Sequence, residues 1–178
     1  MKRFGGQNGF TLVELMVTVA IIAILLKLVG WGLAGVTAYE DVRTAARRLE
    51  AVIQEAKTLA YEKGVVHTIV FDPGGSAYKL FRDDNGNDNR TEPTDGNGKR
   101  DDGEPWLRSD VLSSRVSMTV NDTLPKNGNG APYISVRSDG RLGAPGGGFG
   151  SGGKVTFKSN DDNTATVTIN ALGWVGVD

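Results

Sequence analysis

The first residue that could do chemistry is Glu14, a carboxylate in the almost wholly apolar run GFTLVELMVTVAIIAILL at residues 9–26. An ionisable group in hydrocarbon costs about 2.5–3.5 kcal/mol on insertion scales and is usually functional. A buried charge left without an opposite charge is strongly destabilising. We therefore expect Glu14 to need a partner.

A second group of candidate ligands lies in the acidic segment DDNGNDNRTEPTDGNGKRDDGEP at residues 83–105. Its carboxylate and amide oxygens could converge on calcium, which takes six to eight oxygen ligands. The alternating Asp and Asn residues give the opening spacing of an EF-hand-like loop, and part of the pattern recurs 12 residues later. The candidate calcium ligands are Asp83, Asn85, Asn87, Asp95 and Asp101.

The rest of an EF-hand pattern is missing from this segment. Asp88 occupies the position that needs glycine, and Thr94 the position of the bidentate glutamate. A solvated, turn-rich loop, whose Asn and Asp side chains bond to their own backbone, explains the same composition. The sequence favours this loop, so no cofactor is expected, and calcium is the alternative.

Other motifs lack the context that their chemistry needs. The glycine-rich stretch at residues 148–155 nearly fits a phosphate-binding loop, but Val155 replaces the magnesium-binding hydroxyl and begins a strand pattern. His67 is the single histidine and lies mid-strand, which favours a packed or edge histidine over a metal ligand. The absence of cysteine excludes thiolate zinc sites and cysteine nucleophiles, and no catalytic triad can be assembled. We do not expect an enzyme.

The element that must position the first carboxylate is an apolar helix at residues 10–29. At about 1.5 Å per residue it is long enough to cross a hydrocarbon core of about 30 Å. Lys2 and Arg3 precede it, which predicts a cytoplasmic amino terminus and a body across the membrane. The residues alone leave open a plain single-span anchor, or a secretory signal peptide whose cleavage after Ala38 would start the mature chain at Tyr39.

The helical pattern continues over residues 30–62. Apolar residues recur there at i, i+3 and i+4 spacing, with charged residues opposite: Val42, Ala45, Ala46, Leu49, Val52, Ile53, Ala56 and Ala60. This part is an amphipathic helix that should lay its apolar face on a sheet, and its continuity disfavours a signal peptide. Gly30, Gly32 and Gly35 are its weak point, each costing up to about 1 kcal/mol relative to alanine.

The stretch Gly9-Phe10-Thr11-Leu12-Val13-Glu14-Leu15 resembles the prepilin peptidase site of type IV pilins and type II secretion pseudopilins. The resemblance implies a leader at residues 1–9, cleavage between Gly9 and Phe10, and methylation of the new amino group on Phe10. It also implies that Glu14 pairs with the amino group of a neighbouring subunit during assembly. The implied partners are other pilins or pseudopilins, prepilin peptidase and the inner membrane. Many family members carry a proline in the second half of this helix, and this chain has none there.

Beyond the helix, residues 63–178 change to strand-like patterns. Strands are expected at residues 65–71, 78–81, 116–120, 133–137, 154–158, 164–170 and 172–177, with a hairpin loop at 159–163. Most of the 25 glycines lie beyond residue 70, which also indicates strands and loops. A long helix packed on short antiparallel strands is an α+β fold, here pilin-like, and the resemblance implies that this domain is periplasmic.

The order of these elements resembles the GspH/FimT branch of pilin-like proteins, with matching stretches at residues 69–71, 81–87, 102–107 and 138–141. The resemblance implies a minor structural subunit, namely a GspH-type pseudopilin of a type II secretion pseudopilus. The alternative is a FimT/FimU-type minor pilin of a type IV pilus, involved in DNA uptake. The net charge of −1, and a carboxyl-terminal segment without Lys or Arg after Lys158, offer few cations to phosphates, so nucleic acid is not an expected partner.

Overall fold

The computed structural model describes residues 10–83, 98–143 and 152–178, and at residues 29–36 it describes the backbone alone. The chain divides into two units, Met1–Thr37 and Ala38–Asp178. One helix, α1 (Leu12–Lys63), runs through both units and continues across the three glycines at residues 30, 32 and 35. It ends at Gly64, whose left-handed φ of 69° and N–H bond to the Ala60 carbonyl oxygen (2.9 Å) form a glycine cap.

In the first unit, every side chain from residue 10 to residue 28 is exposed, and most of them are large and apolar. Exposed apolar surface on this scale marks a surface that another molecule or a membrane covers. Over the part of the chain that the structure describes with side chains, no helix meets the length and apolarity needed to span a membrane.

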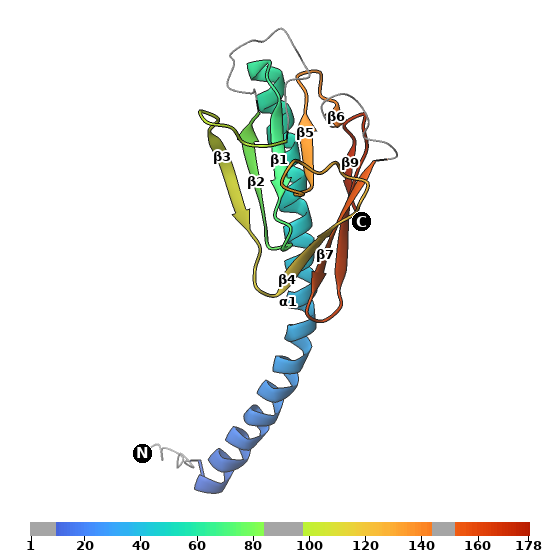
Figure 1. The fold of residues 1–178 in the computed structure, drawn as a ribbon. Coiled ribbons are helices and arrows are strands. Elements are labelled where there is room, and N and C mark those ends of the chain that lie inside the picture. The colour runs from blue at the N-terminus through green and yellow to red at the C-terminus, as the bar shows by residue number, and fades with distance from the viewer. Residues whose placement is uncertain (1–9, 84–97, 144–151) are drawn as a thin grey trace, which may run out of the picture. The chain divides into compact units, whose positions relative to one another are not determined.

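In the second unit, the helical residues from Ala38 onward lie against two antiparallel sheets (Figure 1). All eight apolar positions of the predicted amphipathic face are 7% exposed or less, and Leu49 and Ile53 are fully buried. They belong to one hydrophobic cluster with residues of both sheets. The predicted packing of this helical face is therefore confirmed.

The larger sheet has five strands in the order β3-β2-β1-β5-β6, and every neighbouring pair is antiparallel. Its strands are β1 (His67–Phe71), β2 (Ala77–Arg82), β3 (Trp106–Val111), β5 (Tyr133–Val136) and β6 (Leu142–Gly143). Residues His67 and Thr68 at the start of the central strand β1 are buried, as expected for the packed histidine.

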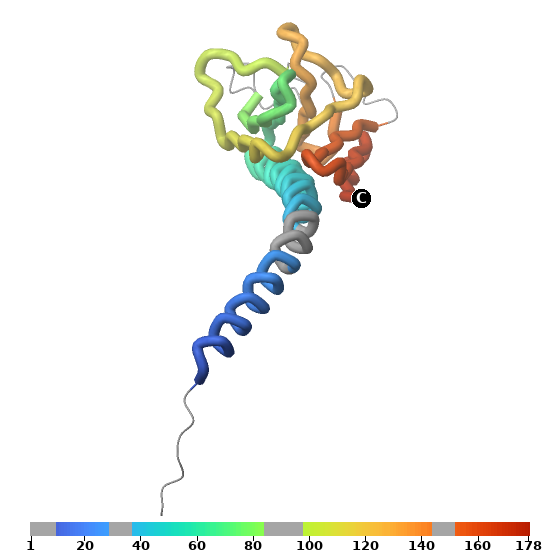
Figure 2. The backbone as a smooth tube through the Cα atoms, turned by 90° about the horizontal axis from the view of Figure 1, so that it is seen from below, coloured from blue at the N-terminus to red at the C-terminus, as the bar shows by residue number. Residues whose placement is uncertain are grey.

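The smaller sheet has the order β4-β7-β8-β9, from β4 (Val116–Val120), β7 (Gly153–Ser159), β8 (Thr164–Ile169) and β9 (Val175–Val177). The predicted hairpin loop joins β7 to β8, and Asp162 takes a left-handed φ of 63° in it. The carboxyl terminus lies at the outside of the β-rich unit, as the view in Figure 2 also shows.

The α+β fold is as predicted, and the differences lie at strand ends and edges. Strand β3 was not expected, because three of its six residues are polar and only one face of this edge strand is covered. Strand β6 has only two residues, too few for a pattern. The strand expected at residues 172–177 begins at Val175, because Gly173 turns the chain with a φ of 92°. The glycine-rich stretch lies outside the described residues up to residue 151, and β7 follows it as predicted.

Candidate functional site

The amino-terminal end of α1 is closed by a reciprocal pair of contacts between Thr11 and Glu14. The Glu14 Oε2 atom accepts the Thr11 backbone N–H (3.1 Å) and the Thr11 hydroxyl (3.0 Å). In return, the Thr11 Oγ1 atom accepts the Glu14 backbone N–H (3.2 Å). This is a capping box, T-x-x-E, in which the threonine is the N-cap residue and the glutamate stands at the third helical position.

The capping box changes how the lone carboxylate is understood. The sequence pattern predicts that Glu14 needs a partner from outside, whereas in the single chain Thr11 already supplies two neutral donors. A carboxylate in the first turn is also favoured by the positive end of the helix dipole. The T-x-x-E spacing can be recognised in the sequence, but it lies within an apolar run that draws attention to membrane insertion rather than to helix capping.

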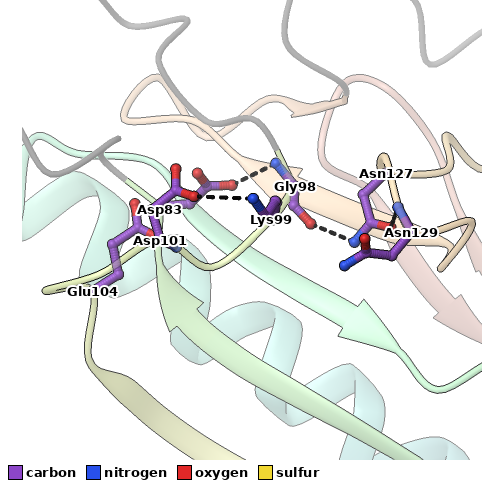
Figure 3. A network of polar contacts seen from close by, with 7 residues as sticks. All are labelled: Asp83, Gly98, Lys99, Asp101, Glu104, Asn127 and Asn129. Atoms are coloured by element: carbon purple, nitrogen blue, oxygen red, sulfur yellow. Dashed lines mark hydrogen bonds and ion pairs between the residues drawn. The ribbon is translucent and has the colours of Figure 1, made fainter.

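The second site lies where the acidic segment leaves and rejoins the larger sheet. Asp83 follows β2 and is fully buried. Its Oδ2 atom accepts the Thr68 hydroxyl (2.7 Å) and the Gly98 backbone N–H (2.9 Å), and Thr68 is within 2.8 Å of the Ser135 hydroxyl. Through these hydrogen bonds, Asp83 links Gly98 to Thr68 on the central strand β1 of the larger sheet. Figure 3 shows Gly98 between Asp83 and Asn127.

Gly98 is held from its other side as well. Its carbonyl oxygen accepts a hydrogen bond from the Asn127 Nδ2 atom (2.8 Å). Its φ is +72°, and an added Cβ would lie 2.6 Å from ring atoms of Tyr133. Burial, and next the nearby charge of Asp83, raise the pKa of the Tyr133 phenol. Only a residue without a side chain fits this position.

A short turn beyond Gly98 buries a second carboxylate, Glu104. It is fully buried, and its Oε2 atom accepts the Asp101 backbone N–H (2.7 Å). The Arg100 Nε–H group donates to the Glu104 carbonyl oxygen (2.7 Å), and the Lys99 ammonium lies 3.7 Å from the Asp101 carboxylate. These contacts stiffen the segment that leads into β3.

Of the five candidate calcium ligands, the structure describes two. Asp83 and Asp101 are both engaged in the contacts above, while Asn85, Asn87 and Asp95 lie outside the described residues. Within residues 10–83, 98–143 and 152–178, no three His, Asp or Glu side chains are grouped to hold a metal ion. Calcium binding stays an untested alternative to the solvated loop that the sequence favours. Sequence patterns could not single out Asp83 as a structural residue, because its hydrogen-bond partners are 15 or more positions away.

Comparisons with known proteins place the chain in a family. A model of the prokaryotic N-terminal methylation motif matches residues 5–26, which include Gly9, Phe10 and Glu14. A model of type II transport protein GspH matches residues 45–173, most of the chain. A search of the curated proteins finds no match.

Solved structures share the fold. The minor pseudopilin EpsH of the Vibrio cholerae type 2 secretion system has a TM-score of 0.51 at 10% identity, over 78% of this chain and 96% of that one. The type IV minor pilin FimU of Pseudomonas aeruginosa has a TM-score of 0.52 at 14% identity, over 78% of this chain and 89% of that one. The chain therefore belongs to the GspH family of type II transport proteins, and its amino terminus carries the prokaryotic methylation motif.

Proposed function

We propose that this subunit is a minor pseudopilin of a type II secretion pseudopilus. Prepilin peptidase cuts the precursor between Gly9 and Phe10, and the new amino group on Phe10 is methylated. Residues 10–29 anchor the chain in the inner membrane, and residues 63–178 form its periplasmic domain. Its partners are other pseudopilins, and its work is structural.

The observation that carries this proposal is the capping box at the cleavage site. The N-cap residue Thr11 directly follows Phe10, so the Glu14 carboxylate is held next to the position where cleavage creates an amine. A charged amine is a stronger partner for a carboxylate than neutral donors are. When a neighbouring subunit supplies that amine, Glu14 exchanges its contacts with Thr11 for an ion pair, and an unpaired carboxylate opposes insertion at any other register.

Three variants separate the charge from the cap. Glu14→Gln retains an acceptor that can serve the capping box but loses the charge. Thr11→Ala loses the cap but keeps the charge, and Glu14→Ala loses both. We expect all three to be cut, and only Thr11→Ala to enter filaments at a level near that of the unmodified chain.

The readouts are the mass of the mature chain and its recovery with sheared filaments. Incorporation of Glu14→Gln at the unmodified level would show that the charge is dispensable. Loss of incorporation in Thr11→Ala, with Glu14→Gln intact, would assign the role of Glu14 to capping alone.

The second candidate is a minor pilin of a type IV pilus. The fold match to FimU supports this candidate to the same degree as the fold match to EpsH supports the pseudopilin. A deletion strain separates the two. Loss of protein secretion with normal pili supports the pseudopilus, and loss of pili with normal secretion supports the pilus. A gel shift with duplex DNA at low salt tests a role in DNA uptake, for which we expect no binding.

A further inference from the structure

A small cavity opens in the second unit between α1 and the β2–β3 side of the larger sheet. Its volume is about 140 Å³. The helix contributes Asp41, Thr44 and Arg48 to its lining, and the sheet side contributes Tyr78 and Asp110, among others. This volume is below the roughly 300–1,000 Å³ of ordinary small-molecule sites and suits the end of one side chain.

The inner wall of the cavity holds an unused hydrogen-bond donor. Tyr78 is 1% exposed, and its hydroxyl makes no hydrogen bond to any residue that the structure describes. Burial, and next the charge of Asp110, raise the pKa of this phenol, so the hydroxyl keeps its proton. The hydroxyl oxygen itself is not sealed from solvent. At the wall of the cavity it can therefore donate to an acceptor that enters.

The carboxylates around the cavity already have ion-pair partners. The Asp41 carboxylate is paired with Arg115 at 3.1 Å, and the Asp110 carboxylate with Arg108 at 2.6 Å. Arg108 also contacts a second carboxylate on α1, Glu55, at 2.9 Å.

Arg48 differs from these arginines. Among the described residues it has no ion pair and no hydrogen bond, and it is exposed at the mouth of the cavity. The Asp41 Oδ2 atom accepts no hydrogen bond but is held by its ion pair with Arg115. The described groups that make neither a hydrogen bond nor an ion pair are thus a guanidinium and a phenolic hydroxyl. Both donate hydrogen bonds, and both suit a carboxylate.

We infer that this cavity receives a carboxylate side chain, Asp or Glu, from a neighbouring pilin-like subunit. Arg48 pairs with the incoming carboxylate, and the Tyr78 hydroxyl donates to it at the base of the cavity. The inference rests on the proposed function, because the cavity lies on α1, the helix through which neighbouring subunits pack in the proposed filament. It adds a second intersubunit contact, far along the chain from Glu14.

The test places a photo-cross-linking amino acid in the full-length chain in cells. One probe replaces Thr44 at the cavity, and a matched control replaces Thr58, an exposed threonine of α1 outside the cavity. A third probe replaces Val17 and reports packing of the amino-terminal helix. We expect the Thr44 probe to capture a pilin-like subunit on a peptide that contains Asp or Glu, and the Thr58 probe not to capture that peptide.

Substitutions then test the chemistry. Arg48→Glu and Arg48→Ala should reduce the Thr44 cross-link by about tenfold or more, since a partner carboxylate loses its cation. Arg48→Lys should retain part of it, and Tyr78→Phe should reduce it severalfold. Changing the captured carboxylate to arginine should restore the cross-link in the Arg48→Glu chain. Melting temperatures should stay unchanged, because neither Arg48 nor the Tyr78 hydroxyl has a partner among the described residues.

The outcomes separate this inference from the proposed function. If the Val17 probe captures a subunit and the Thr44 cross-link is absent or insensitive to Arg48, the cavity inference is wrong and the proposed function stands. A captured peptide without a carboxylate also overturns the inference. If neither probe captures a subunit, the proposed function fails, and the cavity inference that rests on it fails too.

Discussion

Replacing Asp83 with alanine should destabilise the β-rich unit without touching its apolar core. Asp83 is fully buried and its Oδ2 atom accepts hydrogen bonds from Thr68 and Gly98. The Thr68 hydroxyl can turn to Ser135, which lies 2.8 Å away, so its loss is small. The buried Gly98 amide has no such alternative among the contacts described.

The magnitude follows from these contacts. A buried amide left without an acceptor costs about 1–3 kcal/mol. The volume that the carboxylate vacates costs about 1 kcal/mol more. The free energy of unfolding should therefore fall by about 2–4 kcal/mol, a large part of the 5–15 kcal/mol of an ordinary domain. Asp83→Asn keeps a carbonyl oxygen that can accept both hydrogen bonds but loses the charge that strengthens them, and we expect a loss of about half that size.

The assay is urea unfolding of the full-length chain in detergent, followed by tryptophan fluorescence. Trp106 reports on this region because it packs edge-on against Phe81, two residues before Asp83, with ring centroids 5.5 Å apart. At about 2 kcal/mol per molar urea, the middle of the usual range, the midpoint should fall by about 1–2 M. The matched control is Asp122→Ala, whose carboxylate is 95% exposed and pairs with Lys126, and it should lose less than about 0.5 kcal/mol.

A midpoint for Asp83→Ala no lower than that of Asp122→Ala would refute this reasoning. It would mean that Asp83 does not fasten the returning chain to the sheet in solution.

Three further predictions use the same structure. Gly98→Ala should lower the free energy of unfolding in urea by about 1–3 kcal/mol more than Gly103→Ala does. Both glycines have a positive φ, but only at Gly98 would an added Cβ meet a side chain, the ring of Tyr133. Equal losses in the two variants would contradict this contact. Above about pH 10, where unfolded tyrosine ionises, the free energy of unfolding should fall, because burial raises the pKa of Tyr78 in the folded state and the unfolded chain loses its proton first. Tyr78→Phe should flatten that fall by up to about 1.4 kcal/mol per pH unit in denaturation series from pH 8 to 11, and an unchanged slope would contradict the assignment. Millimolar calcium should leave the melting temperature unchanged, since Asp83 is already engaged; a rise that grows with calcium concentration would support the alternative of a calcium site.

The helix and most strands could be predicted because their residues repeat with a clear period. Leu49 and Ile53 lie at helical spacing, and both are buried as the pattern requires. Edge strand β3 could not, because half of its residues are polar and its position depends on pairing with β2. Periodicity reports which face of an element is covered, and an edge strand has little covered face.

Of the candidate sites, the local one could be predicted from the sequence, and those formed by residues far apart in the sequence could not. The cleavage-site motif is local, so seven consecutive residues suffice to find it. The role of Asp83 depends on Thr68 and Gly98, each 15 positions away, and only the folded chain brings them together. Arg48 and Tyr78 are 30 positions apart in the sequence and meet at one cavity for the same reason.

The most direct test of the central claim is mass spectrometry of the mature amino terminus, on protein extracted from membranes of cells that contain prepilin peptidase. A pilin-like subunit made as proposed begins at methylated Phe10, and it keeps its full precursor length when the peptidase gene is deleted. A mature chain that begins at Tyr39, or one that retains residues 1–9 in the presence of the peptidase, would contradict the account.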